Sequence, residues 1–323
     1  MHKNFDNKKN MRTFVAIFLN PNSMRKFIYT LSMLIITSIF TCCTRYELEQ
    51  DVVVGDGANR LTIKLSPFEK SGFDVNPSSR AIVGIDEVCT IINFAVFDSN
   101  GKKVASDNQA SSSRSDFGTF NADLNDGEYN IVIVAHSTAG NATISKPDSI
   151  RFTDNKLSDT FSYYEHISLK GNLTKEICMK RCVAMFRLQL TERIPQNIKY
   201  LKFYYTGGSS TLNATTGFGK VNSRQTEIRE VPEEAYTSKN NIFEVYTIPH
   251  STDDELKMTI SGLAEDGKSE LDQRVFENVP VTQGQITTFS GSIFNTGDAQ
   301  DISSPFKLSI SADNYWSEKK YSF

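Results

Sequence analysis

The sequence has few of the residues on which metal and redox chemistry depends. Its 323 residues include five cysteines, four histidines and a single tryptophan. His136, His166 and His250 are isolated from one another, and neither an H-E-x-x-H nor a C-x-x-C motif occurs. Cys178 and Cys182 are four residues apart in an expected strand, roughly 13 Å, which is too far for a disulfide. We therefore expect no metal, no cofactor and no bond between these two cysteines.

The sequence also has no large net charge and none of the motifs of common hydrolases that we considered. Thirty-five basic and 38 acidic residues give a net charge of −3, which lacks the basic surplus typical of nucleic-acid-binding proteins. No G-x-S-x-G motif occurs, and carboxylate pairs such as Asp253-Asp254 are more often turn residues than catalytic ones. These absences favour a protein that is not an enzyme and binds no nucleic acid. A secreted hydrolase with two facing carboxylates is the remaining enzymatic alternative.

The longest apolar run, residues 27–40, is too short for a transmembrane helix, which needs roughly 20 residues. Two basic residues precede it and Cys42-Cys43 follows it, which is the arrangement of a secretory signal peptide. With residues 39–41 reading Ile-Phe-Thr ahead of Cys42, its end resembles a bacterial lipobox. This resemblance implies acylation of Cys42, with Cys43 as the alternative, and a stable membrane anchor. An ordinary cleaved signal peptide followed by two incidental cysteines is the other interpretation.

The chain divides into a leader and two segments of domain size. Met24 is the expected start, so that residues 1–41 comprise an upstream extension and the signal peptide. The polar segment 42–59 is expected to be a linker behind the lipid. The rest is expected to form an N-terminal β-sandwich over residues 60–172 and a C-terminal β-sandwich over residues 173–323.

Strand patterns separated by turn residues recur along both segments. Leu61–Leu65 alternates apolar and polar residues, and residues 91–97 form a nearly continuous apolar run before Asn100-Gly101, a strong hairpin signal. The longest alternating pattern covers residues 177–190, and a short helix is conceivable within residues 154–164. Further strands are expected at residues 131–135, 200–205, 242–248, 256–261, 285–294 and 306–310. The sequence thus predicts an all-β protein of two sandwiches.

Aromatic residues are abundant, with 22 phenylalanines and 12 tyrosines. Exposed aromatic side chains would stack on sugar rings in a glycan-binding protein, whereas alternate aromatics in sandwich strands belong to the core. The sequence favours the core for the clusters at residues 163–164, 203–205, 315–316 and 321–323. A lipid-anchored glycan-binding protein of a polysaccharide uptake system is the alternative function.

Several segments after the signal peptide follow one another in an informative order. They include Leu61–Leu65, Asn93–Gly101, Leu124–Tyr129, Met179–Met185 and Thr287–Phe294. In this order they resemble the fimbrillin and fimbrial-anchor families of Bacteroidales. The resemblance implies two transthyretin-like (Greek-key) β-sandwich domains and a structural subunit or membrane anchor of a surface fimbrium (pilus) that supports adhesion. It also implies a surface-exposed lipoprotein of the cell outer membrane.

The resemblance further implies partners and processing sites. The partners are other fimbrial subunits, bound by β-strand addition, and a host or bacterial surface ligand. In these families a trypsin-like protease removes an N-terminal strand after an arginine, which makes Arg60 and Arg80 the candidate cleavage sites; ordinary loop arginines are the alternative. Phe306, Leu308 and Ile310 mark a candidate donor strand, for which the alternative is the last strand of the second domain. Anchor members keep both the lipid and the N-terminal strand, so the choice between anchor and stalk stays open.

Overall fold

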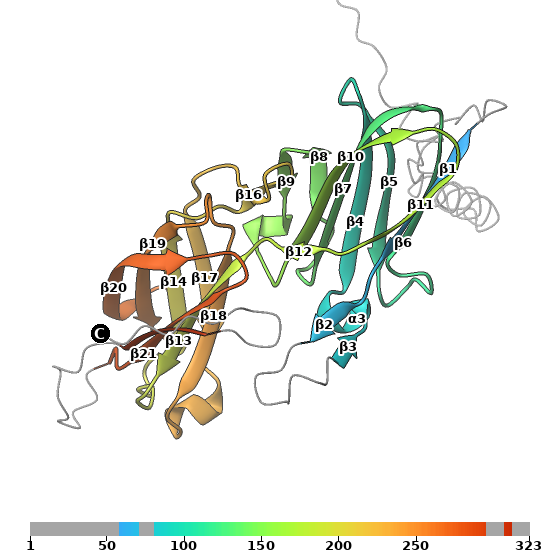
Figure 1. Cartoon of the computed structure of the whole chain (residues 1–323). Helices are drawn as coiled ribbons and strands as arrows, with labels where there is room; N and C mark the ends of the chain where they lie inside the picture. The colour runs from blue at the N-terminus through green and yellow to red at the C-terminus, as the bar shows by residue number, and fades with distance from the viewer. Residues whose placement is uncertain (1–57, 71–80, 295–306, 312–323) are drawn as a thin grey trace, which may run out of the picture. The chain divides into compact units, whose positions relative to one another are not determined.

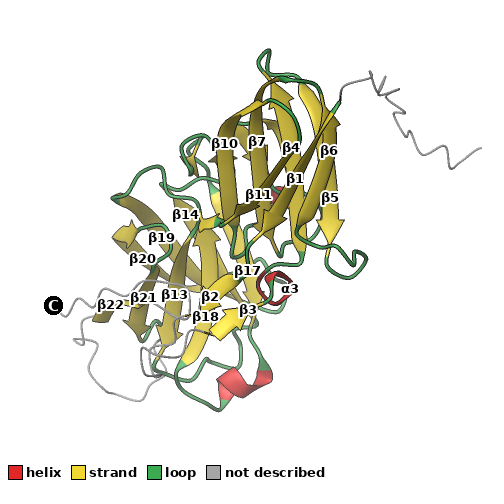
Figure 2. Cartoon of the chain, turned by 45° about the vertical axis from the view of Figure 1, so that its right-hand side comes forward, coloured by secondary structure: helices red, strands yellow, loops and turns green. Residues whose placement is uncertain are grey.

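The computed structural model describes residues 58–70, 81–294 and 307–311 (Figure 1). Nearly all regular structure in these ranges is β-strand (Figure 2). The exceptions are helix α3 (Ile85–Val88) and the 3-10 turns η1 (Thr153–Asn155) and η2 (Glu233–Tyr236). No helix in this described part is long and apolar enough to cross a membrane. The all-β prediction is confirmed, whereas the expected signal peptide lies outside the described residues.

The N-terminal half forms two sheets that face each other. One has the strand order β11-β1-β6 and the other the order β12-β10-β7-β4-β5. The strands are β1 (Asn59–Leu65), β4 (Ile91–Asp98), β5 (Lys103–Ala110), β6 (Thr119–Leu124), β7 (Gly127–His136), β10 (Phe161–Leu169), β11 (Leu173–Ile177) and β12 (Lys180–Arg181). The first core lies between the sheets, where the rings of Phe94 and Phe120 stack at 5.0 Å. Between β1 and β4 in the sequence, β2 (Phe68–Lys70) and β3 (Ala81–Val83) pair antiparallel as a short two-stranded sheet.

The C-terminal half repeats this arrangement with two four-stranded sheets. Their strand orders are β18-β13-β21-β22 and β17-β14-β19-β20. The strands are β13 (Ala184–Leu190), β14 (Tyr200–Thr206), β17 (Gln225–Glu230), β18 (Asn241–Thr247), β19 (Asp254–Leu263), β20 (Glu270–Val281), β21 (Ile286–Gly291) and β22 (Lys307–Ser311). The second core fills the space between them and includes Phe186, Phe203 and Phe276.

Strands β4 and β7 bury both of their faces. Phe94 points into the first core, whereas Phe97, three residues further along β4, packs in a third cluster, the shared core. The shared core also contains Leu212 and Ile248 from the C-terminal half. A strand buried on both faces needs apolar residues at successive positions, which explains the continuous run at residues 91–97.

A small antiparallel sheet also joins the two halves. Its strand order is β16-β15-β9-β8, and β9 of the N-terminal half pairs antiparallel with β15 of the C-terminal half. The strands are β8 (Thr143–Lys146), β9 (Ser149–Arg151), β15 (Thr211–Asn213) and β16 (Phe218–Gly219). The halves therefore share main-chain hydrogen bonds as well as a core.

The predicted Asn100-Gly101 turn is confirmed. It connects β4 and β5 as an antiparallel hairpin, and Gly101 has the positive φ of 76° that favours glycine. The Asp126-Gly127 turn has another role, because it carries the chain from β6 in one sheet to β7 in the facing sheet. Residues 154–164 form no α-helix; they contain most of η1 and the start of β10.

The pattern at residues 177–190 is not one strand. It is divided among the end of β11, the short β12, and β13, which leaves Cys178 exposed and Cys182 buried, both as free thiols. β11 pairs with β1, so the first sandwich extends past the boundary expected at residue 172. The physical reason is that Ile177 is buried in the first core, which holds this strand there.

Candidate functional site

Strand β1 is the candidate site because it is paired on both sides. It runs parallel to β11, with Leu61 opposite Leu173, and antiparallel to β6, with Leu61 opposite Ala122. Its main-chain groups are therefore satisfied by two neighbours rather than left at a free edge. Loss of β1 would leave a gap between β6 and β11 and remove hydrogen-bond partners from both.

Three side chains of β1 fill part of the first core. Leu61 and Ile63 are completely buried and Leu65 is 7% exposed. Because burial of one such side chain stabilises by about 2 kcal/mol, the three together contribute on the order of 6 kcal/mol. Thr62 lies on the opposite face, where its hydroxyl donates to Asn121 Oδ1 at 2.8 Å. The alternation expected from the sequence thus places the apolar side chains of β1 in the first core, with β1 itself between β6 and β11.

Polar contacts hold the start of β1. The side chain of Asn59 donates a hydrogen bond to Asp126, and the main-chain N–H of Arg60 donates to Asn172 Oδ1 at 2.7 Å. The Arg60 guanidinium lies 3.3 Å from Asp123 Oδ1, but both side chains are about half exposed. An ion pair in that position contributes little, so the hydrogen bonds of the Asn59 side chain and the Arg60 main chain position this end.

Arg60 is the second residue of β1 rather than a loop residue ahead of it. This corrects the expectation that Arg60 precedes the strand. A cut after Arg60 would leave Leu61–Leu65 in the sheet and could not empty the gap. Arg80, Cys42 and Cys43 lie outside the described residues, so cleavage and acylation stay predictions.

The candidate donor strand lies at an edge of the C-terminal sandwich. β22 pairs antiparallel with β21, with Leu308 opposite Phe289 and Ile310 opposite Thr287. Phe306 lies outside the described residues. This position is that of the last strand of the second domain, the alternative interpretation of its sequence, and donation to another subunit stays a prediction.

A buried carboxylate, which sequence reasoning missed, holds the chain at the end of the second sandwich. Glu192 is 8% exposed, and its Oε1 accepts hydrogen bonds from the main-chain N–H groups of Ile293 at 2.6 Å and Phe294 at 2.7 Å. Burial raises the pKa of Glu192, and these two N–H groups oppose the shift. No local pattern marks Glu192, because its partners are more than 100 residues away.

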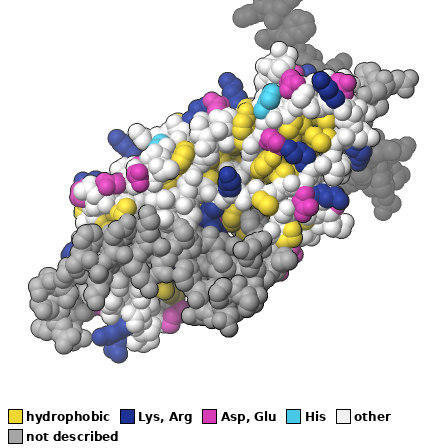
Figure 3. Space-filling model, in the orientation of Figure 1, with side chains coloured by type: hydrophobic (Ala, Val, Ile, Leu, Met, Phe, Trp, Pro, Cys, Tyr) yellow, Lys and Arg dark blue, Asp and Glu magenta, His cyan; other side chains and the backbone are white. Residues whose placement is uncertain are grey.

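Most of the clustered aromatic side chains in the described ranges are buried or half-buried. Phe203 and Tyr205 are buried in the second core, and Tyr163 and Tyr164 are half-buried. Tyr204, at 37%, is the one aromatic among the exposed large hydrophobic side chains of the described ranges. Lys/Arg and Asp/Glu are interspersed on the face in Figure 3. The same ranges contain no group of three His, Cys, Asp or Glu side chains that could hold a metal ion.

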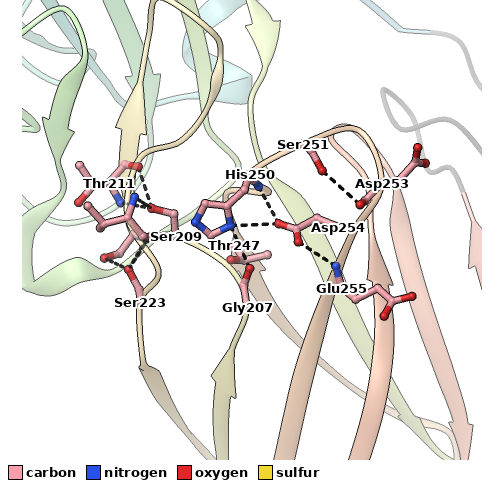
Figure 4. A network of polar contacts seen from close by, with 12 residues as sticks. Gly207, Ser209, Thr211, Ser223, Thr247, His250, Ser251, Asp253, Asp254 and Glu255 are labelled. Carbon is pink, nitrogen blue, oxygen red and sulfur yellow. Dashed lines mark hydrogen bonds and ion pairs between the residues drawn. The ribbon is translucent and has the colours of Figure 1, made fainter.

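Ser209, His250 and Asp254 belong to a polar network of the C-terminal half (Figure 4). His250 Nδ1 lies 3.1 Å from Asp254 Oδ2 and 3.0 Å from the Gly207 carbonyl oxygen, both acceptors, so this nitrogen carries the hydrogen. The Ser209 hydroxyl is fully buried and donates to the Thr211 carbonyl oxygen at 2.9 Å. These contacts fasten the turns around the network and do not arrange Ser209 as a nucleophile.

Several solved structures match this chain over most of its length at low sequence identity. A putative adhesin from Bacteroides ovatus is 11% identical, with a TM-score of 0.48 over 79% of this chain and 96% of its own. A putative polysaccharide binding protein from Bacteroides thetaiotaomicron is 11% identical, with a TM-score of 0.47 over 81% and 98%. The fimbrial anchor protein Mfa2 from Porphyromonas gingivalis is 10% identical, with a TM-score of 0.42 over 82% and 100%. Among curated proteins, none matches the sequence.

The sequence itself gives the family. The family model Mfa2, described as fimbrillin-A associated anchor proteins Mfa1 and Mfa2, matches residues 85–273, which is more than half of the chain. The matched range runs from α3 into β20. Fimbrial anchors are surface proteins rather than enzymes, so the predictions of a fimbrial surface protein and of a non-enzymatic role are confirmed. This chain belongs to the family of the fimbrillin-A associated anchor proteins Mfa1 and Mfa2.

Proposed function

We propose that the protein is a lipid-anchored fimbrial anchor that keeps its N-terminal strand. Cys42 (alternatively Cys43) carries the acyl chains in the outer membrane, and segment 42–59 links the lipid to β1. Two transthyretin-like sandwiches then carry the contact with other fimbrial subunits. The observation that supports this proposal is the integration of β1, which is paired on both sides and buries Leu61 and Ile63 completely.

An anchor requires β1 to stay attached to the rest of the chain, whereas a stalk subunit requires β1 to be removed. Segment 42–59 can extend to at most about 60 Å, so a force on the lipid would reach the folded protein through β1. A cut after Arg80 would separate the lipid and β1 from the rest of the chain. The fibre would then be held by non-covalent contacts alone. An uncut chain therefore suits an anchor, whereas an emptied gap suits a polymerising subunit.

The deciding test is the intact mass and N-terminal sequence of the mature protein from the cell surface. We expect an uncut chain with acyl groups on Cys42. A free N-terminus at Ala81 would overturn the anchor proposal and indicate a polymerising subunit. A free N-terminus at Leu61 would also overturn the lipid anchorage, but it would leave the buried part of β1 in the sheet. Cys42→Ala should lose outer-membrane partitioning, and Cys43→Ala, the matched control, should keep it. The reverse result would assign the lipid to Cys43.

For the contact with other subunits, we propose β-strand addition through β22. This strand is at a sheet edge near the end of the chain, and its apolar residues alternate with polar ones. Leu308→Asp or Ile310→Asp should abolish co-purification with the fimbrial subunits. Lys307→Ala and Ser309→Ala, at the alternate positions, should leave it unchanged. Normal co-purification of Leu308→Asp would exclude β22 from this contact.

A further inference from the structure

Strands β1 and β11 lie at the two ends of the N-terminal sandwich in sequence and run parallel to each other. β1 is its first strand, and β11 precedes the two-residue β12, after which the chain passes to β13 of the C-terminal half (Figure 1). The register runs from Leu61 opposite Leu173 to Leu65 opposite Ile177. The chain therefore enters this pair of strands at one end and leaves it at the other.

This arrangement decides how the pair responds to a pull on the chain. A pull at Asn59 toward the N-terminus and a pull at Ile177 toward the C-terminus act in opposite directions along the strands. The hydrogen bonds of a parallel pair are evenly spaced, so such a load stretches all of them at once. A load on two neighbouring strand ends would instead open the bonds one after another.

Hydrogen bonds fasten both ends of β1 to the strand beside it or to its flanking residues. At the start, the main-chain N–H of Arg60 donates to Asn172 Oδ1 at 2.7 Å. Just past the other end, the N–H of Ser66 donates to the Ile177 carbonyl oxygen at 2.8 Å. The attachment of β1 to β11 thus covers the whole length of the pair.

β1 also cannot release the load by slipping along its neighbours. A shift of one residue, about 3.3 Å, would bring Thr62 and Lys64 into the first core in place of apolar side chains. A shift of two residues would bring Pro67 to the place of Leu65, whose N–H donates to the Gly118 carbonyl oxygen at 2.9 Å. Proline has no N–H to replace that donor. β1 therefore stays in register until its bonds break together.

The chain that leaves β11 is fastened as well. Arg181, whose side chain is 6% exposed, donates from Nε to Asp159 Oδ1 at 2.6 Å. The N–H of Cys182 donates to the Thr160 carbonyl oxygen at 2.9 Å. A pull from the C-terminal half therefore reaches the first sandwich at the end of β11, opposite the end at which segment 42–59 enters.

We infer that β1 and β11 form a shear clamp, the paired residues 61–65 and 173–177, which resists a pull between the membrane and the C-terminal half. The antiparallel neighbour β6 adds to the resistance, since β1 would be drawn along it as well. The clamp follows from the parallel pairing. It rests on the proposed lipid anchorage only for the source of the pull.

The test is single-molecule pulling with optical tweezers on the mature chain, residues 42–323, expressed without acyl groups and with Cys43→Ala. DNA handles are attached to Cys42 and to Cys178, an exposed free thiol directly after β11. Cys89 and Cys182 are buried, and burial raises the pKa of both thiols to about 12, so they do not react with the handles. This placement loads β1 and β11 in shear.

A second placement of the handle supplies the matched control. Cys178→Ala combined with Lys170→Cys moves the handle to an exposed position in the turn before β11, beside the start of β1. The same two strands are then peeled apart from one end. We expect the first placement to need at least about twice the force of the second, because its bonds share the load and break together. Equal forces would overturn the inference.

Substitutions in β11 test which bonds carry the load. The Ile177 carbonyl faces β1, and main-chain direction alternates along a strand, so Lys175 also faces β1 while Thr174 faces the free side. Lys175→Pro should therefore lower the force in the first placement, whereas Thr174→Pro should not. Lys175→Ala controls for the ion pair with Glu165, and circular dichroism checks folding.

The clamp and the anchorage can fail separately. A folded Lys175→Pro protein with unchanged force, or equal forces in the two placements, would overturn the clamp even if the chain at the cell surface is uncut and acylated. A cleaved chain at the cell surface would overturn the anchorage and leave the difference in force intact.

Discussion

The carboxylate of Glu192 accepts a hydrogen bond from the main-chain N–H of Phe294, 102 residues further along the chain. Phe294 itself is 5% exposed and packs in the second core, where a Cβ on Gly262 would come within 2.9 Å of its ring. The pair fixes the position of the chain just before residues 295–306. It thereby holds the chain that follows β21 against the second core.

Removing this carboxylate should destabilise the second sandwich. Glu192→Ala leaves two main-chain N–H groups without their acceptor, so we expect the free energy of unfolding to fall by about 3 kcal/mol. Glu192→Gln keeps an acceptor oxygen and should lose less. Urea denaturation gives the comparison, with the exposed Glu233→Ala as control. Equal stability of Glu192→Ala and Glu233→Ala would contradict the assigned role.

Weakening the buried side of β1 should loosen this strand. Ile63 is completely buried, so Ile63→Ala should lower the free energy of unfolding by roughly 3 kcal/mol. Lys64→Ala, the next residue on the exposed face, should change it by less than about 0.5 kcal/mol. Hydrogen exchange should report faster opening of β1, β6 and β11 in Ile63→Ala. Similar exchange in both variants would mean that the buried side chain of Ile63 does not hold β1 in the first core.

His136 should make stability depend on pH in the acidic range. It is 1% exposed, its Nε2 lies 3.1 Å from Asn93 Oδ1, and burial lowers its pKa from 6.5 to about 4. Between these values the unfolded chain binds a proton that the folded chain does not. The free energy of unfolding should therefore fall as the pH drops from about 6.5 to about 4, by roughly 3 kcal/mol in all.

The measurement is urea denaturation of the wild type and of His136→Gln at several pH values across that range. The glutamine cannot titrate, so the difference in stability between the two proteins should shrink as the pH falls. A difference that is constant with pH would show that His136 is not the titrating group.

Two glycines with positive φ should respond very differently to alanine. Gly207 has φ 101°, and a Cβ there would lie 2.3 Å from the Glu255 carbonyl oxygen, whereas Gly217 has φ 79° and open space around it. Gly217→Ala should cost about 1 kcal/mol for the backbone conformation alone. Gly207→Ala adds a main-chain clash and should cost several times more. Thermal unfolding compares the two, and equal losses would contradict the close contact at Gly207.

Local patterns were sufficient for most central strands and for the hairpin turn at Asn100-Gly101. They failed at β20, because an edge strand with exposed residues on both faces lacks the alternation that marks a half-buried strand. They also failed at residues 177–190, where one alternating pattern is divided between two sandwiches. Alternation specifies which face of a strand is apolar and says nothing about which sheet receives that face.

For the candidate site, the sequence by itself determined that Leu61–Leu65 is a half-buried strand behind a lipobox-like signal. Its period of two and the cysteine after the apolar run are local features. Only the tertiary structure decided that β11 pairs with β1, that Arg60 lies inside the strand and that Glu192 binds the main chain of Phe294. These relationships join residues far apart in sequence, and many partners satisfy the same local pattern. Which partner is chosen depends on the packing of the whole core.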